Sequence, residues 1–206
     1  MTLDRLRPVA ERGLTPFVAA ADRLGLSPDG VSVLAFGCAV AAGGGFVVAT
    51  PTAYVLGSLL VFLNGWLDLV DGALAREQGV ESSGGDLLDH ALDRYADLAV
   101  LVGLTAGIGR WRLGLAAVTG VLMTSYMGTQ IQAVGVGREY GGLLGRADRL
   151  ALVGVVAVVA ALAPGLAVTL PTVGDIGAVA ALLGLFAVVG HFTALQRFWG
   201  AWSDLS

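Results

Sequence analysis

The sequence contains no lysine and is poor in charge of either sign. Charged residues make up 14% of its 206 residues, whereas about a quarter is usual for a soluble domain. All 12 basic residues are arginines and the net charge is −4, so the dense basic stripe of a nucleic-acid-binding protein is missing. The single cysteine, Cys38, excludes an internal disulfide and a cysteine-based metal cluster. With 56% hydrophobic residues, the composition predicts a chain that lies in a bilayer and has no nucleic-acid partner.

The hydrophobic residues gather into six stretches, each close to the ~20 residues that span a bilayer. No charge occurs from Val31 to Leu67, and Pro51 divides that run into two helices. The predicted spans are residues 31–50, 52–75, 86–108, 113–135, 150–174 and 176–196, the fifth ended by Pro171. The 31 glycines suit membrane helices, where small residues allow close approach. We therefore predict an all-α integral membrane protein of six transmembrane helices in one domain, residues 1–206.

Residues 1–30 precede the first span and differ from it in character. Residues 3–24 mix leucines with arginines, a pattern typical of an amphipathic helix on the membrane surface. The sequence Ser27-Pro28-Asp29-Gly30 then predicts a turn into the first span. The charges in this region do not fit a cleavable signal peptide.

The arginines are distributed unequally between the two sides that six spans would define. One side has Arg110 and Arg112. The side of the N-terminus has nine arginines: Arg5, Arg7, Arg12, Arg23, Arg76, Arg138, Arg146, Arg149 and Arg197. Because cytoplasmic loops carry the excess of positive charge, we predict a multi-pass protein of the cell membrane with both termini in the cytoplasm.

Six aspartates lie between positions 68 and 97, where the chain enters or leaves predicted spans. An ionised side chain inside a bilayer is costly and indicates function. Asp68 and Asp71 are three residues apart and Asp89 and Asp93 four apart, so each pair shares one face of a helix. Clustered carboxylates repel one another unless cations neutralise them, and their hard oxygen atoms suit Mg²⁺ or Mn²⁺, which also bind phosphate oxygens. The other two, Asp86 and Asp97, equally suit helix caps or a solvated loop.

These aspartates belong to a longer pattern. It reads Asp68-x-x-Asp71-Gly72-x-x-Ala75-Arg76, eight residues, then Gly85-x-x-x-Asp89-x-x-x-Asp93. Position for position, it resembles the signature of the CDP-alcohol phosphatidyltransferase family. The turn Gly25-Leu26-Ser27-Pro28 before the first span and the six-span layout behind a surface helix extend the resemblance over nearly the whole chain.

The resemblance implies an enzyme that moves a phosphatidyl-type group from a CDP-linked lipid to a small alcohol and releases CMP. The donor would be CDP-diacylglycerol in a bacterium or CDP-archaeol in an archaeon, and the protein would be a homodimer with its active site facing the cytoplasm. The implied cofactor is two Mg²⁺ or Mn²⁺ ions, with Asp93 also serving as the general base. The implied metal ligands are Asp68, Asp71, Asp89 and Asp93.

Further motif residues would accommodate the CDP group. By resemblance, Gly72 and Ala75 are small where cytidine and phosphates approach, Arg76 pairs with phosphate oxygens, and Gly85 lets the loop turn so that Asp89 faces its partners.

The alcohol acceptor is less clearly indicated. Arg138, Arg146 and Arg149 cluster before the fifth span, where they would bind a phosphorylated acceptor or simply anchor the loop by its positive charge. Family members that make inositol-phosphate lipids resemble Arg146-Ala-Asp-Arg149 but carry basic residues where this chain has Gly128 and Gln130. The resemblance therefore leaves open inositol phosphate, glycerol phosphate, serine or another polar alcohol. His191 and Arg197 are further candidates for acceptor contacts.

Three alternatives compete with this interpretation. An intramembrane prenyltransferase also binds a diphosphate through magnesium, and Asn64-x-x-x-Asp68 resembles half of its first motif, but Asp71 falls one position early. An ion or proton transporter also holds intramembrane carboxylates, usually near the midplane and with a repeat. An inactive scaffold would not need all four motif aspartates.

Overall fold

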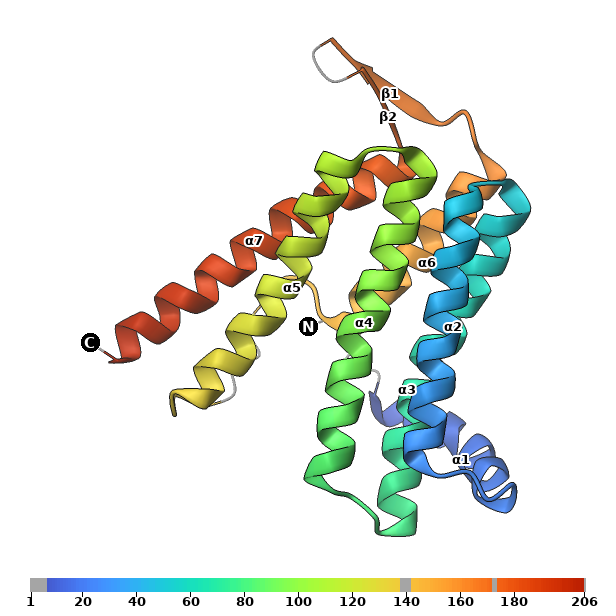
Figure 1. Ribbon diagram of the computed structural model, residues 1–206, viewed down its shortest axis with the longest axis vertical. Helices are drawn as coiled ribbons and strands as arrows, with labels where there is room; N and C mark the ends of the chain where they lie inside the picture. Colours follow the sequence, from blue (N-terminus) through green and yellow to red (C-terminus); the bar gives the residue numbers. More distant parts are fainter. Residues whose placement is uncertain (1–6, 138–141, 172–173, 206) are drawn as a thin grey trace.

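The computed structural model describes residues 7–137, 142–171 and 174–205, with no account of the side chains of residues 7–12 and 170. Within these ranges the chain forms seven α-helices and one β-hairpin (Figure 1). In order they are α1 (Arg7–Arg23), α2 (Pro28–Val48), α3 (Pro51–Gln78), α4 (Ser83–Ile108), α5 (Trp111–Ala133), α6 (Arg146–Leu162), β1 (Ala167–Leu170), β2 (Gly174–Gly177) and α7 (Ala178–Leu205). The prediction of an all-α protein is confirmed apart from the short hairpin.

Helix boundaries near the aspartates are set by local capping. Thr50 caps α3, where its hydroxyl accepts a hydrogen bond from the N–H of Ala53 and Pro51 follows as the first helical residue. Gly79 ends α3 with a φ of 63°, a left-handed conformation that glycine adopts without strain. Ser82 then caps α4 by accepting from the N–H of Gly85 at 3.0 Å. The two aspartate-bearing helices are therefore joined by a tight connection.

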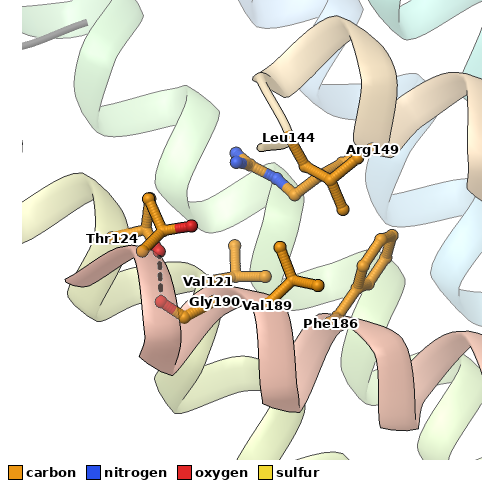
Figure 2. Close-up of a pocket in the computed structure, with 8 residues that line it drawn as sticks. Val121, Thr124, Leu144, Arg149, Phe186, Val189 and Gly190 are labelled. Atoms are coloured by element: carbon orange, nitrogen blue, oxygen red, sulfur yellow. Dashed lines mark hydrogen bonds between the residues drawn. The ribbon is translucent and has the colours of Figure 1, made fainter. Parts of the chain in front are cut away.

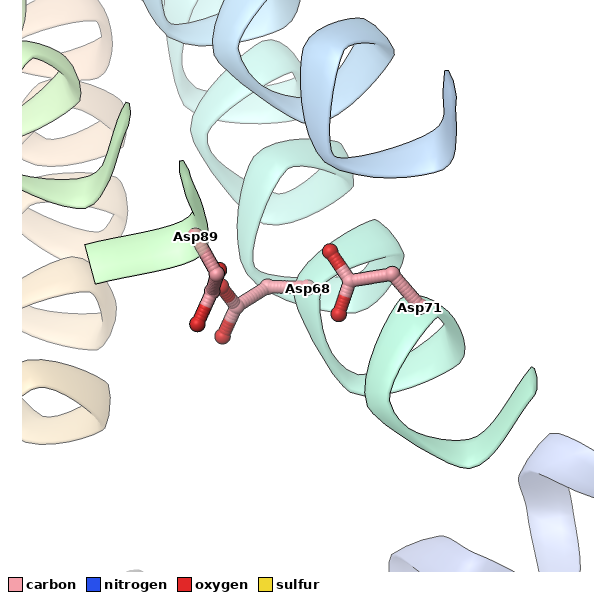
Figure 3. Close-up of side chains that lie close together, drawn as sticks. All are labelled: Asp68, Asp71 and Asp89. Atoms are coloured by element: carbon pink, nitrogen blue, oxygen red, sulfur yellow. The ribbon is translucent and has the colours of Figure 1, made fainter. Parts of the chain in front are cut away.

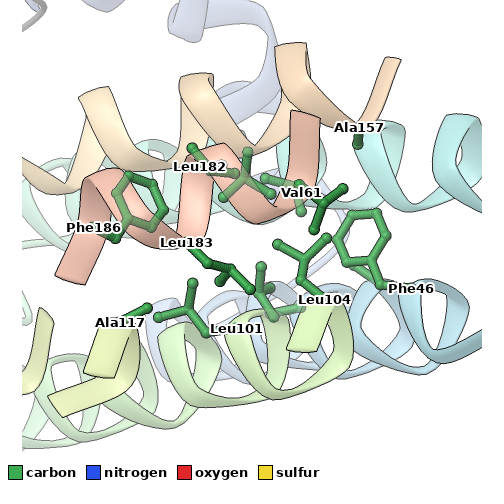
Figure 4. Close-up of a cluster of buried hydrophobic side chains, with 14 of the residues drawn as sticks. Phe46, Val61, Leu101, Leu104, Ala117, Ala157, Leu182, Leu183 and Phe186 are labelled. Carbon is green, nitrogen blue, oxygen red and sulfur yellow. The ribbon is translucent and has the colours of Figure 1, made fainter. Parts of the chain in front are cut away.

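The helices pack in two groups that share one apolar core. Helix α2 packs against α3 and α4, α6 packs on α3, and α5 pairs with α7. Side chains from all of these helices meet in the core shown in Figure 4, where Phe46, Leu104 and Leu183 are almost completely buried. Many large apolar side chains on the outer faces are exposed, among them Leu59, Phe62 and Val188. Such a surface suits lipid rather than water.

Glycines bring α2 and α4 into backbone contact. A Cβ atom on Gly43 would collide with the backbone carbonyl group of Ala99, and a Cβ atom on Gly103 would collide with the backbone of Gly43. The two helices cross here at the closest possible approach, as small residues allow in membrane proteins. This crossing fixes how α4 lies relative to α2.

Three helices are long and apolar enough to cross a membrane within the part of the chain that the structure describes: α2, α3 and α7. Helix α4 carries aspartates over its first four turns, and α6 has 17 residues. The count of six spans is therefore not established by helix length and composition and stays a prediction.

The predicted fifth span, 150–174, is wrong in its second half. Helix α6 ends at Leu162, just before Pro164 and Gly165, because proline disfavours a helical conformation in the residue that precedes it. The chain then forms the antiparallel β1–β2 hairpin instead of continuing to Pro171. Helix α7 also extends beyond the predicted end of the sixth span, to Leu205.

The hairpin lies at the opposite end of the molecule from α1 (Figure 1). The carboxylate of Asp175 accepts a hydrogen bond from the Thr169 hydroxyl at 2.6 Å, and its backbone carbonyl accepts one from Arg110. The hairpin is thereby attached to the α4–α5 turn.

Helix α1 has one buried face, as an amphipathic sequence requires. Leu14 and Val18 are buried and pack with Val70 and Leu74 of α3, while Phe17 is half exposed beside Trp66. The predicted helix exists, and its location on a membrane surface stays a prediction.

We expect Gly43→Ala to destabilise the protein by about 1–3 kcal/mol, because the added methyl group meets backbone that no rotamer change can move. Thermal unfolding in detergent would measure this as a lower Tm. Gly44→Ala is the matched control, since a Cβ atom there meets no heavy atom within 4 Å among the described residues. Equal Tm values for the two variants would contradict the close crossing.

Candidate functional site

Three aspartate side chains from two helices meet at one point. Asp68 and Asp71 come from α3, and Asp89 comes from the second turn of α4 (Figure 3). One carboxylate oxygen from each lies within 4.8 Å of the others. The spacings predicted a shared helix face for Asp68 and Asp71, and the α3–α4 connection brings Asp89 to them.

This cluster has the donor chemistry of a divalent cation site. Asp71 is buried, and its Oδ2 accepts a hydrogen bond from the Ser32 hydroxyl of α2 at 2.6 Å, which fixes its orientation. Beside it, Asn64 is 2% exposed and its Oδ1 has no hydrogen-bond partner among the described residues. Three carboxylates and an amide oxygen around one small pocket fit Mg²⁺ or Mn²⁺, which take oxygen ligands.

Arg146 joins this cluster to Asp93. Its Nη1 atom lies 2.6 Å from Asp68 Oδ2 and its Nη2 atom lies 2.6 Å from Asp93 Oδ1. Arg146 is the first residue of α6, and the Asp148 carboxylate holds that helix start by accepting from the N–H of Gly145 at 2.9 Å. Asp93 thus lies beside the three-carboxylate cluster, one guanidinium group away from Asp68.

A second pocket opens between α5, α6 and α7, and its polar side chains include Arg149, Thr124 and Thr193 (Figure 2). Arg149 is 8% exposed, and its Nη2 atom donates to Asp97 Oδ2 at 3.1 Å. Its Nε–H has no acceptor within the described part of the chain. A buried guanidinium group of this kind suits an anion such as a phosphate ester.

The remaining predicted residues lie around the α3 end. Gly72 and Ala75 are partly buried and Arg76 is exposed, with its Nη1 atom 3.6 Å from where a Cβ of Gly72 would stand. Gly85 lies within the first turn of α4 rather than in a loop, so the expected loop turn at that glycine is wrong. Arg138 lies outside the described residues.

Several side chains at or near the two pockets were not predicted as site residues. Ser32 and Asn64 lie on the apolar spans and carry no charge that would have marked them. Asp97 was noted as a capping or loop residue, but it lies in the middle of α4 and is 7% exposed. The i, i+4 spacing from Asp93 was the available signal.

Arg197 of α7 fills space that a side chain on α5 would otherwise occupy. Its Nη1 atom donates to the Thr124 carbonyl oxygen at 2.6 Å and lies 3.0 Å from where a Cβ of Gly128 would stand. A guanidinium group from α7 thus lies beside Gly128. His191 is exposed, with its Nε2 atom 3.3 Å from the Thr119 hydroxyl.

The apolar helices, the oxygen-ligand cluster and the cationic pocket together define a membrane enzyme that handles phosphate esters. A family model described as CDP-alcohol phosphatidyltransferase matches residues 26–192, and the chain belongs to that family. Membership confirms the predicted resemblance and favours it over the prenyltransferase, transporter and scaffold alternatives.

Curated relatives are similar over most of their length. The archaetidylinositol phosphate synthase of Methanothermobacter thermautotrophicus is 32% identical, with 98% of this chain and 95% of that protein covered. The phosphatidylinositol phosphate synthase of Streptomyces avermitilis is 35% identical, with 84% of this chain and 75% of that protein covered.

Solved structures share the fold. A crystal structure of phosphatidylinositol phosphate synthase from Mycobacterium tuberculosis with CDP-DAG bound matches with a TM-score of 0.76 and 30% identity, covering 93% of this chain and 94% of that one. A second structure of that enzyme, in complex with manganese and citrate, matches with a TM-score of 0.77 and 30% identity, covering 92% and 88%.

We expect Ser32→Ala to lower the affinity for Mn²⁺ by about tenfold, because Asp71 loses the partner that orients it. Titration of the purified protein with Mn²⁺, followed by the electron paramagnetic resonance signal of the free ion, would measure this. Ser58→Ala is the control, since Ser58 donates to the Gly154 carbonyl away from the cluster. An unchanged affinity in the Ser32 variant would show that the Ser32 hydrogen bond does not position Asp71 for the ion.

Proposed function

We propose that this enzyme transfers a phosphatidyl or archaetidyl group from a CDP-linked lipid to inositol phosphate and releases CMP. The observation that carries this proposal is the adjacency of an acidic cluster and a cationic pocket, connected through neighbouring residues of α6. Arg146 contacts Asp68 and Asp93, and Arg149, one turn later, reaches into the second pocket. A donor diphosphate and an acceptor phosphate would then lie on either side of Asp93.

The acidic cluster is the proposed site of the donor diphosphate. Asp68, Asp71, Asp89 and Asp93 would hold two Mg²⁺ or Mn²⁺ ions, which supply Lewis-acid stabilisation of the charge that develops on phosphate oxygens. Gly72, Ala75, Arg76 and Gly85 lie toward the same end of α3 and α4 and would accommodate the CDP group. The Mycobacterium tuberculosis relative with CDP-DAG bound supports a CDP-lipid donor.

Asp93 is the proposed general base. Its carboxylate takes the proton of the acceptor hydroxyl, and the acceptor oxygen forms a bond to the phosphorus that carries the lipid. The bond from that phosphorus to the oxygen of CMP breaks, and CMP leaves with the electron pair. Asp93 is 15% exposed, so it can reach a substrate while most of its surface is shielded from water.

The second pocket is the proposed acceptor site. Arg149 would bind the acceptor phosphate there, with Arg146 alongside, and Arg138, outside the described residues, is a further proposed contact. Arg197 beside Gly128 adds positive charge at this end of α5. The names of the archaeal and bacterial relatives favour inositol phosphate, and glycerol phosphate is the alternative that the same pocket chemistry would accept.

The fold and the arginine distribution support a specific membrane arrangement. We propose that α2 to α7 cross the membrane, that α1 lies on the cytoplasmic surface, and that both termini and the site face the cytoplasm. Arg110 lies at the hairpin end, opposite α1 (Figure 1), as the positive-inside rule requires for the sparsely charged side. We also propose a single domain and, from family resemblance, a homodimer.

The decisive experiment is CMP release by the purified protein given CDP-archaeol or CDP-diacylglycerol, magnesium, and one acceptor at a time. We expect release that depends on inositol phosphate and stops when a chelator is added. Release with glycerol phosphate but not with inositol phosphate would show that glycerol phosphate is the acceptor. If folded protein releases no CMP with any acceptor, the proposed function is refuted.

Replacing Asp93 by Asn should lower the rate of CMP release at least about 100-fold, because general-base catalysis contributes roughly that much. The variant should stay folded, since the amide has nearly the same volume and Arg146 keeps its ion pair with Asp68. Asp86→Asn is the matched control on the same helix, because Asp86 is exposed and lies outside both pockets. Full activity of Asp93→Asn would remove Asp93 from the mechanism.

A further inference from the structure

Asp97 lies one helical turn beyond Asp93 and belongs to neither the acidic cluster nor the lining of either pocket. Its side chain is 7% exposed in the middle of α4. A buried carboxylate is costly unless cations compensate it. The structure supplies two: Arg94 Nη1 lies 3.3 Å and Arg149 Nη2 lies 3.1 Å from Asp97 Oδ2.

The two arginines are held differently. Arg94 also donates to the Ser125 hydroxyl of α5, and its Nη2 atom lies 3.7 Å from Asp93 Oδ2. The backbone of Arg149 belongs to α6, and its guanidinium group extends over the second pocket (Figure 2). Asp97 contacts the Arg149 guanidinium group through Nη2 only. The Nε–H of Arg149 has no acceptor within the described residues.

Because a guanidinium group is planar and its donors are fixed in direction, an ion pair on one edge determines where the other donors point. We propose that Asp97 is a positioning residue for the acceptor phosphate. It fixes the Arg149 guanidinium so that its remaining donors face the pocket between α5, α6 and α7. This inference rests on the proposed function, since it takes a phosphorylated acceptor as the ligand of Arg149.

Asp97 also shares a second arginine, Arg94, with Asp93. Arg94 already lies within ion-pair distance of Asp93, and Asp97 is the other carboxylate that it contacts. Without the negative charge of Asp97, Arg149 would lose its ion-pair partner, whereas Arg94 would keep its contacts with Asp93 and Ser125.

The test is the kinetics of Asp97→Asn with CDP-lipid, magnesium and inositol phosphate. We expect the KM for inositol phosphate to rise about tenfold, with the KM for the CDP-lipid and the Mn²⁺ affinity changed less than about threefold, because the acidic cluster is untouched. Inorganic phosphate should also compete less well with inositol phosphate in the Asp97→Asn variant than in the wild-type protein. Asp86→Asn is the control that removes an exposed carboxylate from the same helix.

A double-mutant cycle separates positioning from general structural support. If Asp97 acts through Arg149, then Asp97→Asn should add less than about twofold to the acceptor KM once Arg149→Gln is present. The charge-conserving Asp97→Glu should keep more acceptor affinity than Asp97→Asn, which also provides a second variant should the amide fold poorly.

Different failures have different meanings. If the wild-type protein releases no CMP with inositol phosphate, the proposed acceptor is wrong whatever the variants do. If the wild-type protein turns over and Asp97→Asn leaves the acceptor KM unchanged, or raises the donor KM equally, the positioning role is refuted while the proposed function stands. Additive effects of Asp97→Asn and Arg149→Gln would also refute it.

Discussion

The structure depends on balancing negative charge that is concentrated inside an apolar helix bundle. Asp68, Asp71, Asp89 and Asp93 converge from two helices, and their mutual repulsion in a region of low dielectric opposes folding. Arg146 bridges two of them with ion pairs of 2.6 Å. The start of α6 is therefore fixed by the acidic cluster, and the second pocket lies one helical turn further along. Charge compensation thus locates both pockets with respect to each other.

The acidic cluster was largely predictable from the sequence, whereas only the arginine of the cationic pocket was, and not the residues around it. Spacings of three and four residues place carboxylates on one helix face whatever the tertiary structure, so Asp68 and Asp71 could be paired in advance. The contact with Asp89 follows from a short connection capped by Gly79 and Ser82. The partners of Arg149 come from helices distant in the chain, and no local spacing encodes them.

Two expectations were wrong for identifiable physical reasons. Hydropathy alone extended the fifth span through Pro164 and Gly165, because no charged residue occurs from Leu150 to Gly174 to mark where the helix ends. Gly85 was assigned to a loop because glycine is common in turns, yet it lies in the first turn of α4, where the Ser82 cap organises the backbone. In both places the average conformational preference of a residue type was less informative than the neighbouring residues, a proline in one case and a helix cap in the other.

The contact between α2 and α4 has a consequence for how such an enzyme adapts to different membranes. At Gly43 and Gly103 the helices touch through backbone atoms, so the contact has no rotamers to adjust. The position of Ser32 on α2 relative to Asp89 on α4 therefore does not depend on the side chains that face the lipid. The side chains on the outer surface can therefore change to suit ester-linked or ether-linked membranes without altering this contact between α2 and α4. The lipid-facing side chains and the backbone contact can therefore change independently on the same two helices.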